Sequence, residues 1–240
     1  MMSTQTTNSK IIVALDYADA TSALAFVNKL NPNLCRLKVG KELFTSSGPQ
    51  LVAQLVEKKY DVFLDLKFHD IPNTVAKACE AAAKLGVWMI NVHSSGGQDM
   101  MQAAKEGITK SGYKPLLIAV TVLTSSNQNM LDSIGITCPM EQQVLKLASL
   151  TKLAGLDGVV CSALEVDLLR KNFPREFCLV TPGIRPENIN HDDQTRVVSP
   201  RDAIKSGSDY LVIGRPITQA SDPIKVLMKI NQEIANLEIV

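Results

Sequence analysis

The sequence contains few aromatic residues, few histidines and no apolar run that could cross a membrane. Phe, Trp and Tyr make up 5% of the 240 residues, and Trp occurs once. The apolar run at residues 116–123 is far too short to span a bilayer. Residues 1–10 are polar and lack the apolar segment of a secretory signal. We therefore expect a soluble, cytoplasmic protein without a membrane segment.

An excess of charge of either sign is also absent. The chain has 25 Lys and Arg residues against 24 Asp and Glu residues. A protein that binds nucleic acid or an anionic membrane over a broad surface usually carries a marked basic excess. We expect neither kind of partner, and any anion must then be bound locally.

The cysteines and histidines form no pattern typical of a metal site or of a disulfide framework. The five cysteines are an odd number without a Cys-x-x-Cys pair, and the three histidines are scattered. These counts favour free, mostly buried thiols and no metal site. No Gly-x-Gly-x-x-Gly follows the first apolar run, so the main sign of a dinucleotide site is missing as well.

Short apolar runs of the kind found in buried strands recur eight times and alternate with helical patterns. Strands buried on both faces indicate a parallel sheet, and eight units in one domain favour a closed barrel over an open sheet. The sequence therefore predicts an α/β protein with a single (β/α)8 TIM barrel domain over residues 1–240, of which residues 1–9 form a frayed N-terminus. The expected strands lie at 11–15, 34–39, around 62–64, 87–92, 116–122, 158–161, 177–180 and 210–213. The expected helices lie at 19–30, 49–59, 72–85, 96–107, 140–154, 164–171 and 223–237.

Polar residues gather where these strands end. In a (β/α)8 barrel the carboxyl ends of the strands form the catalytic face, so we expect these residues to meet there. They are Asp16, Lys38, Asp65, Lys67, His93, Thr124, Thr181 and Arg215.

The third strand carries the densest group of charges. Side chains alternate along a strand, so Asp65 and Lys67 should point the same way. Burial of such charges is unfavourable unless they are paired, and Asp70 supplies a second carboxylate within reach of the lysine. A simple salt-bridged strand end is the alternative interpretation of this group.

A phosphate site is expected at the last two strands. Gly214 permits a close approach of the backbone, and Arg215 offers a charged fork. A surface ion pair is the alternative role for Arg215. The loop 183–198 is long enough to be a lid, and it contains two arginines, Arg185 and Arg196.

Residues 65–74, Asp-Leu-Lys-Phe-His-Asp-Ile-Pro-Asn-Thr, resemble the Asp-x-Lys-x-x-Asp-Ile-Pro-x-Thr signature of the orotidine 5′-monophosphate decarboxylases. The resemblance implies a lyase that converts orotidine 5′-monophosphate to uridine 5′-monophosphate without a cofactor, in de novo pyrimidine biosynthesis. It runs from about residue 10 to the end of the chain. Further matching segments are residues 14–16, 37–40, 91–93, 121–125, 181–186 and 214–217.

The resemblance also implies roles for single residues. Lys38, Asp65, Lys67 and Asp70 would form a charged network, with Asp70 contributed by the partner subunit of a homodimer. Lys67 would be both the cation and the proton donor at the reacting carbon. The implied substrate-binding residues are Asp16 and Lys38 at the ribose, Thr124 at the pyrimidine, Arg185, Gln194, Gly214 and Arg215 at the phosphate, and Ile71 and Thr74 reaching into the neighbouring site.

Two other functions compete with this interpretation. A magnesium-dependent sugar-phosphate decarboxylase or hexulose-phosphate synthase of the same barrel superfamily shares the Asp-x-Lys-x-x-Asp pattern. Thr124 and Gln194 argue against it. A catalytically idle barrel that only binds nucleotides or a partner protein is the second alternative, and the intact charged group around Lys67 argues against that one.

Overall fold

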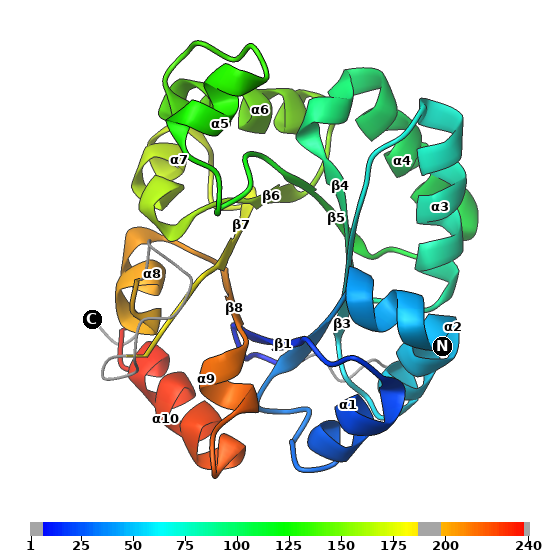
Figure 1. Ribbon diagram of the computed structural model, residues 1–240, viewed down its shortest axis with the longest axis vertical. Coiled ribbons are helices and arrows are strands. Elements are labelled where there is room, and N and C mark those ends of the chain that lie inside the picture. Colours follow the sequence, from blue (N-terminus) through cyan, green and yellow to red (C-terminus); the bar gives the residue numbers. More distant parts are fainter. Residues whose placement is uncertain (1–6, 187–197, 238–240) are drawn as a thin grey trace.

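Eight parallel strands close into a barrel in the order of the sequence, and helices surround it (Figure 1). The computed structural model describes residues 7–186 and 198–237. The ring closes where β1 pairs with β8, with Ile11 opposite Leu211. The prediction of a (β/α)8 barrel is therefore confirmed. The strands are β1 (Ile11–Leu15), β2 (Arg36–Gly40), β3 (Val62–Phe68), β4 (Met89–His93), β5 (Leu116–Val120), β6 (Gly158–Val160), β7 (Cys178–Pro182) and β8 (Tyr210–Ile213).

The helices form the outer layer. The longer ones are α1 (Ala20–Val27), α2 (Lys41–Glu57), α3 (Pro72–Lys84), α4 (Gly97–Ser111), α6 (Met140–Leu153) and α10 (Pro223–Ala235). The shorter ones are η1 (Ser94–Gly96), α5 (Gln128–Ser133), η2 (Ala163–Glu165), α7 (Val166–Asn172), α8 (Pro200–Ser206) and α9 (Arg215–Thr218). Among the described residues no helix is both long and apolar enough to cross a membrane.

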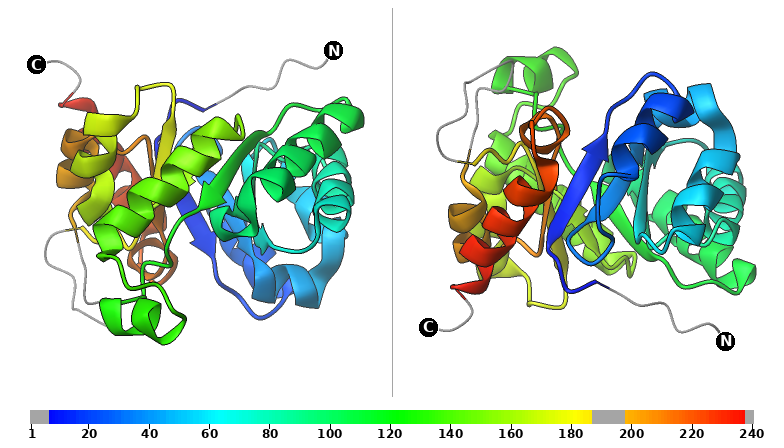
Figure 2. Two further views of the ribbon diagram at one scale, coloured as in Figure 1. Left: turned by 90° about the horizontal axis from the view of Figure 1, so that it is seen from above. Right: turned by 90° about the horizontal axis from the view of Figure 1, so that it is seen from below.

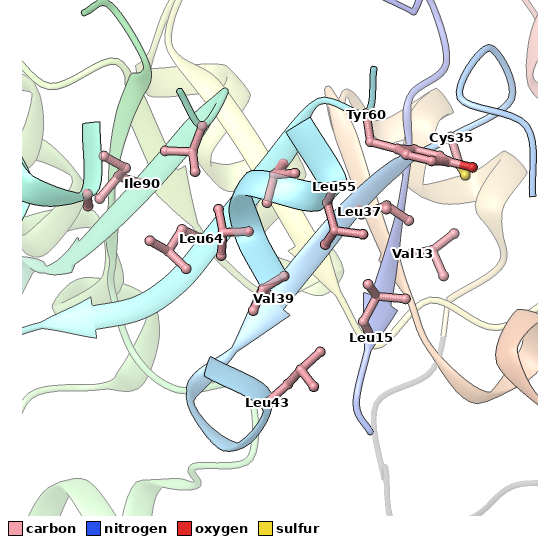
Figure 3. Packing of buried hydrophobic residues seen from close by; sticks show 14 of the residues in the cluster. Val13, Leu15, Cys35, Leu37, Val39, Leu43, Leu55, Tyr60, Leu64 and Ile90 are labelled. Carbon is pink, nitrogen blue, oxygen red and sulfur yellow. The ribbon is translucent and has the colours of Figure 1, made fainter. Parts of the chain in front are cut away.

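The main hydrophobic core lies between the outer face of the strands and the helices. Figure 3 shows Val13, Leu37 and Leu64 of neighbouring strands packed with Leu43 and Leu55 of α2. These strand residues alternate with residues that face the barrel axis, because successive side chains of a strand point to opposite sides. The strands thus carry buried apolar side chains on both faces, as the continuous apolar runs predicted.

The inside of the barrel is filled in layers. A middle layer contains Ile12, Phe63, Met89 and Ile118, all buried. Because the side-chain period of a strand is two, residues two positions further along reach the carboxyl end of the barrel on the same inner side. Asp65 and Asn91 follow Phe63 and Met89 by two positions, so the barrel directs polar groups to that end.

The opposite end of the barrel is closed by Arg36. Its guanidinium lies over the rings of Trp88, at 4.5 Å, and Tyr210, at 5.0 Å. It also forms an ion pair with Asp61 at 3.3 Å and donates hydrogen bonds to the carbonyls of Thr7 and Ser9. These bonds attach Thr7 and Ser9 to this end of the barrel, which we call the barrel floor.

Three local features differ from the expectations. Thr7 and Ser9, expected in a frayed terminus, are buried because their hydroxyls bond to Asn33 and Asn231. The second helix begins at Lys41 rather than at residue 49, with a kink at Gly48, whose φ is +67°. The short helices α5, α8 and α9 were not predicted.

The side views show at which end of the barrel the short helix α5 lies. In both panels of Figure 2, α5 lies at the end opposite the one where the described chain begins. The chain enters at the amino ends of the strands, so α5 belongs to the end at which the strands terminate.

All five cysteines are free thiols, and burial raises the pKa of Cys79 to about 12.

Candidate active site

A cavity of about 310 Å³ opens at the carboxyl end of the strands. Residues on every strand except β4 line it, and it contains most of the polar residues that the sequence placed at strand ends. Its lining residues are Ala14, Asp16, Lys38, Phe63, Asp65, Lys67, Val120, Val122, Leu123, Thr124, Val160, Pro182, Gly183, Ile184, Arg185, Val212, Gly214, Arg215 and Pro216.

Asp65 is the centre of the charged group on one side of this cavity. Its Oδ1 lies 2.6 Å from Lys67 Nζ, and its Oδ2 lies 3.5 Å from Lys38 Nζ. Lys38 Nζ also lies 3.3 Å from Asp16 Oδ1. Residues on or just after β1, β2 and β3 therefore form one line of alternating charges, Asp16, Lys38, Asp65 and Lys67.

Asp65 remains ionised in this position. Burial opposes ionisation, but the positive charges of Lys38 and Lys67 and hydrogen bonds from Lys67 and Asn91 outweigh it, so the pKa of Asp65 lies below its usual value. Asp65 is 8% exposed. A fixed carboxylate beside the cavity thus holds two ammonium groups in place.

The backbone at Lys67 is unusual. Its φ is +52°, in the left-handed region, and the pairing of β3 with β4 shifts between Leu64 and Phe68. For a residue other than Gly this conformation is unfavourable by roughly 1–2 kcal/mol, and such strain gathers at functional sites. The amide of Lys67 donates to Asn91 Oδ1 at 2.8 Å, and Asn91 Nδ2 donates to Asp65 Oδ1 at 2.7 Å. Asn91 belongs to the matching segment 91–93 of the sequence, but the sequence assigned it no role.

Two arginine residues, which follow β7 and β8, also line the cavity. Arg215 is the first residue of α9, directly after Gly214, and Arg185 follows β7. Arg185 is 8% exposed, and its amide donates to the carbonyl of Val198. A Cβ added at Gly214 would lie 3.6 Å from Ala14 Cβ and 3.7 Å from Asp16 Oδ2, so this residue stands beside the carboxyl end of β1. Gln194 and Arg196 lie outside the described residues.

Three expected site residues do not line the cavity of their own chain. Asp70, Ile71 and Thr74 are exposed, and Ile71 is 67% exposed. Asp70 Oδ1 accepts a hydrogen bond from the amide of Ile71, and the described part of the chain contains no ion pair between Asp70 and Lys67. Asp70 therefore does not pair with Lys67 of its own chain, and its expected contribution to the site of a partner subunit stays a prediction.

Two other polar residues at strand ends have local partners. Thr181 is buried, and its hydroxyl donates to Ser208 Oγ at 3.1 Å. His93 stands 5.6 Å from His69, centroid to centroid. Burial and then the neighbouring His69 lower the pKa of His93. No group of three or more His, Cys, Asp or Glu side chains suited to a metal ion occurs within residues 7–186 and 198–237.

The chain is similar to known proteins over nearly all of its length. Residues 9–230 match the Orotidine 5'-phosphate decarboxylase / HUMPS family. The Orotidine 5'-phosphate decarboxylase of Tolumonas auensis is 59% identical over 231 residues, which are 95% of this chain and 100% of that protein. The enzyme of the same name from Chromobacterium violaceum is 58% identical, over 95% of this chain and 93% of its own. The crystal structure of Orotidine 5'-phosphate decarboxylase from Lactobacillus acidophilus superposes with a TM-score of 0.86 at 40% identity and covers 95% of this chain and 99% of its own.

Proposed function

The chain belongs to the Orotidine 5'-phosphate decarboxylase / HUMPS family, and on that premise we propose how it acts as an orotidine 5′-monophosphate decarboxylase. The observation that carries the proposal is one cavity lined both by a line of charges that ends in Lys67 and by two arginines, Arg185 after β7 and Arg215 after β8. A nucleotide has the matching chemistry, since its reacting base and its phosphate lie at opposite ends. The reaction places the protein in pyrimidine biosynthesis.

Lys67 is proposed as the residue at the reacting carbon. Loss of carbon dioxide from the pyrimidine leaves negative charge on C6, so the site needs a fixed cation there and a proton to deliver. The ammonium of Lys67 supplies both. Its ion pair with Asp65, at 2.6 Å, supports the charged state that this role requires.

Asp65 holds the cation and faces the leaving group. Because its pKa is lowered, it carries a negative charge in a cavity that would also receive the substrate carboxylate. Two like charges repel, and departure of carbon dioxide relieves the repulsion. Lys38 balances the second oxygen of Asp65 at 3.5 Å.

The remaining cavity residues bind the rest of the nucleotide. We assign Asp16 and Lys38 to the ribose hydroxyls, because they are paired at the edge of the cavity. Thr124 takes the pyrimidine. Arg215 with Gly214, and Arg185, take the phosphate, since an arginine fork matches phosphate oxygens. In the same proposal Gln194 also binds the phosphate.

The proposed enzyme is a homodimer with shared sites. Asp70, Ile71 and Thr74 are exposed at the start of α3, and the side chain of Ile71 is a large apolar group in water. A two-fold interface pairs one patch with its own copy, so each chain could place these residues in the other chain's site. Asp70 would then join Lys67 from across the interface.

No cofactor enters this proposal. The family also covers the magnesium-dependent alternative, but the relatives at 58–59% identity carry the decarboxylase name. The test is to mix the purified protein with orotidine 5′-monophosphate in metal-free buffer and to follow the ultraviolet absorbance. Steady loss of the substrate signal is expected, with and without a chelator. Turnover that appears only with added magnesium would favour the alternative.

A further inference from the structure

Asn91 is a buried polar residue beside Asp65 and Lys67. The proposed reaction assigns it no role. It lies on β4, has no exposed surface and does not line the cavity. It therefore has no route to the substrate. Its two polar atoms instead bond to the two residues whose geometry matters most, Asp65 and Lys67.

The two hydrogen bonds act on different parts of those residues. Asn91 Oδ1 accepts from the backbone amide of Lys67 at 2.8 Å, within the register shift of β3 on β4. In a regular parallel pair this amide would bond to a backbone carbonyl of the neighbouring strand. A side-chain acceptor replaces that partner and allows Lys67 to adopt a φ of +52°.

The second bond orients the carboxylate. Asn91 Nδ2 donates at 2.7 Å to Asp65 Oδ1, the same oxygen that lies 2.6 Å from Lys67 Nζ. With this oxygen held by the amide, Oδ2 is left to face Lys38. A single amide thus links the backbone of Lys67 to the rotation of Asp65.

We propose that Asn91 is a positioning residue for decarboxylation, which holds the left-handed bulge at Lys67 and the rotation of Asp65 through one amide group. The inference rests on the proposed function. A lysine ammonium that leaves its place by about 1 Å can lose about 100-fold in rate. Asn91 therefore affects the chemical step and leaves substrate binding nearly unchanged.

The first test is Asn91→Leu, which keeps the size of the side chain and removes both hydrogen bonds. We expect kcat to fall by about 100-fold while KM stays within about threefold. The matched control is Ser94→Ala. Ser94 is equally buried and follows the same strand, but its hydroxyl bonds to Thr151 at 3.0 Å, away from the cavity. This control should keep the parental kcat.

The second test is Asn91→Asp, which keeps the acceptor for the Lys67 amide and replaces the donor by an oxygen. Two carboxylates so close cannot both ionise without strong repulsion, and a shared proton would restore the lost hydrogen bond. The charged and titratable groups around them are Lys38 on β2, Lys67 on β3 and His93 on β4. Relative to the parent, the loss of kcat should therefore shrink as the pH falls from about 8 to about 6.

The outcomes separate this inference from the function itself. A parent protein without activity would overturn the proposed function. An active parent with a kcat of Asn91→Leu within about threefold of its own would overturn only the role of Asn91. If Asn91→Leu does not fold, Asn91→Asp decides, and a loss of kcat that is the same at both pH values would overturn the inference.

Discussion

The ammonium of Lys67 lies 2.6 Å from the carboxylate of Asp65, which precedes it by two residues on β3. Residues i and i+2 of an extended strand are separated by roughly 6.6 Å, and their side chains run side by side. The long side chain of Lys67 spans that separation, at a residue whose φ is +52° and where the pairing of β3 with β4 shifts. The ion pair at the centre of the site therefore lies at a local departure from strand geometry.

Replacing Lys67 by Ala should abolish turnover and leave the fold intact, because the cation and the proton source disappear together. We expect kcat to fall by at least about 1,000-fold. Lys59→Ala is a matched control, since Lys59 is also a lysine with positive φ, at +68°, but is exposed. Steady-state kinetics measure the effect. A loss of less than about tenfold, roughly 1.4 kcal/mol of barrier, would contradict the assignment.

Replacing Arg215 by Ala should weaken the nucleotide far more than the bare nucleoside. The phosphate supplies binding energy at one end of the substrate that is used at the reacting carbon. The comparison of kcat/KM for orotidine 5′-monophosphate and orotidine, in the parent and the variant, measures this. Arg201→Ala, on the exposed start of α8, serves as the control. Equal losses on both substrates would move the phosphate role to another residue.

Mixtures of two inactive variants should regain activity if Asp70 serves the partner's site. Lys67→Ala and Asp70→Ala homodimers should each be nearly inactive. In a mixed dimer one site carries both defects, and the other has an intact Lys67 and an intact Asp70. Random exchange makes half of the dimers mixed, so activity should approach about a quarter of the parental value.

Exchange of subunits must be shown independently, for example with differently tagged chains. Recovery near zero despite exchange would mean that Asp70 acts within its own chain. A mixture of Lys67→Ala with Asp65→Ala is the control. Both residues lie in one chain's cavity, so no site in that mixed dimer is intact if Asp70 alone crosses the interface.

Replacing Arg36 by Met should destabilise the barrel floor by about 3–5 kcal/mol, because it leaves Asp61 buried without its partner. Burial already raises the pKa of Asp61, against the effect of Arg36, and loss of the guanidinium would raise that pKa further. A group whose folded pKa exceeds its unfolded value loses stability as pH rises through the folded pKa. The penalty should therefore be larger at about pH 7.5 than at about pH 4.5.

Urea unfolding at the two pH values measures this penalty. The double variant Arg36→Met with Asp61→Asn is the control, since it removes the charge that is left alone. Its stability should depend on pH less than that of Arg36→Met. A penalty that does not change with pH would show that the loss arises from packing on Trp88 and Tyr210 alone.

The eight apolar runs were sufficient to predict the strands and the closed barrel. Each run is short and buried on both faces, and the same pattern that marks a strand also marks its end, where the polar residues begin. Asp16, Lys38, Asp65, Lys67, Thr124 and Arg215 could therefore be assigned to one end of the barrel before any contact was known. The structure confirms that all six line one cavity. Their roles in the reaction remain predictions.

Other features depended on contacts between residues distant in the chain. The amide of Lys67, whose backbone is left-handed, donates to an acceptor on β4, 24 residues away in sequence, and no local pattern predicts a positive φ at a lysine. Thr7 and Ser9 are ordered by Asn33 and Asn231, so their order could not be read from a polar terminus. The outward position of Asp70 was likewise decided by the path of the loop after β3. Apolar periodicity is a property of neighbouring residues and is visible in sequence, whereas the partner of a buried polar atom is chosen by the folded chain.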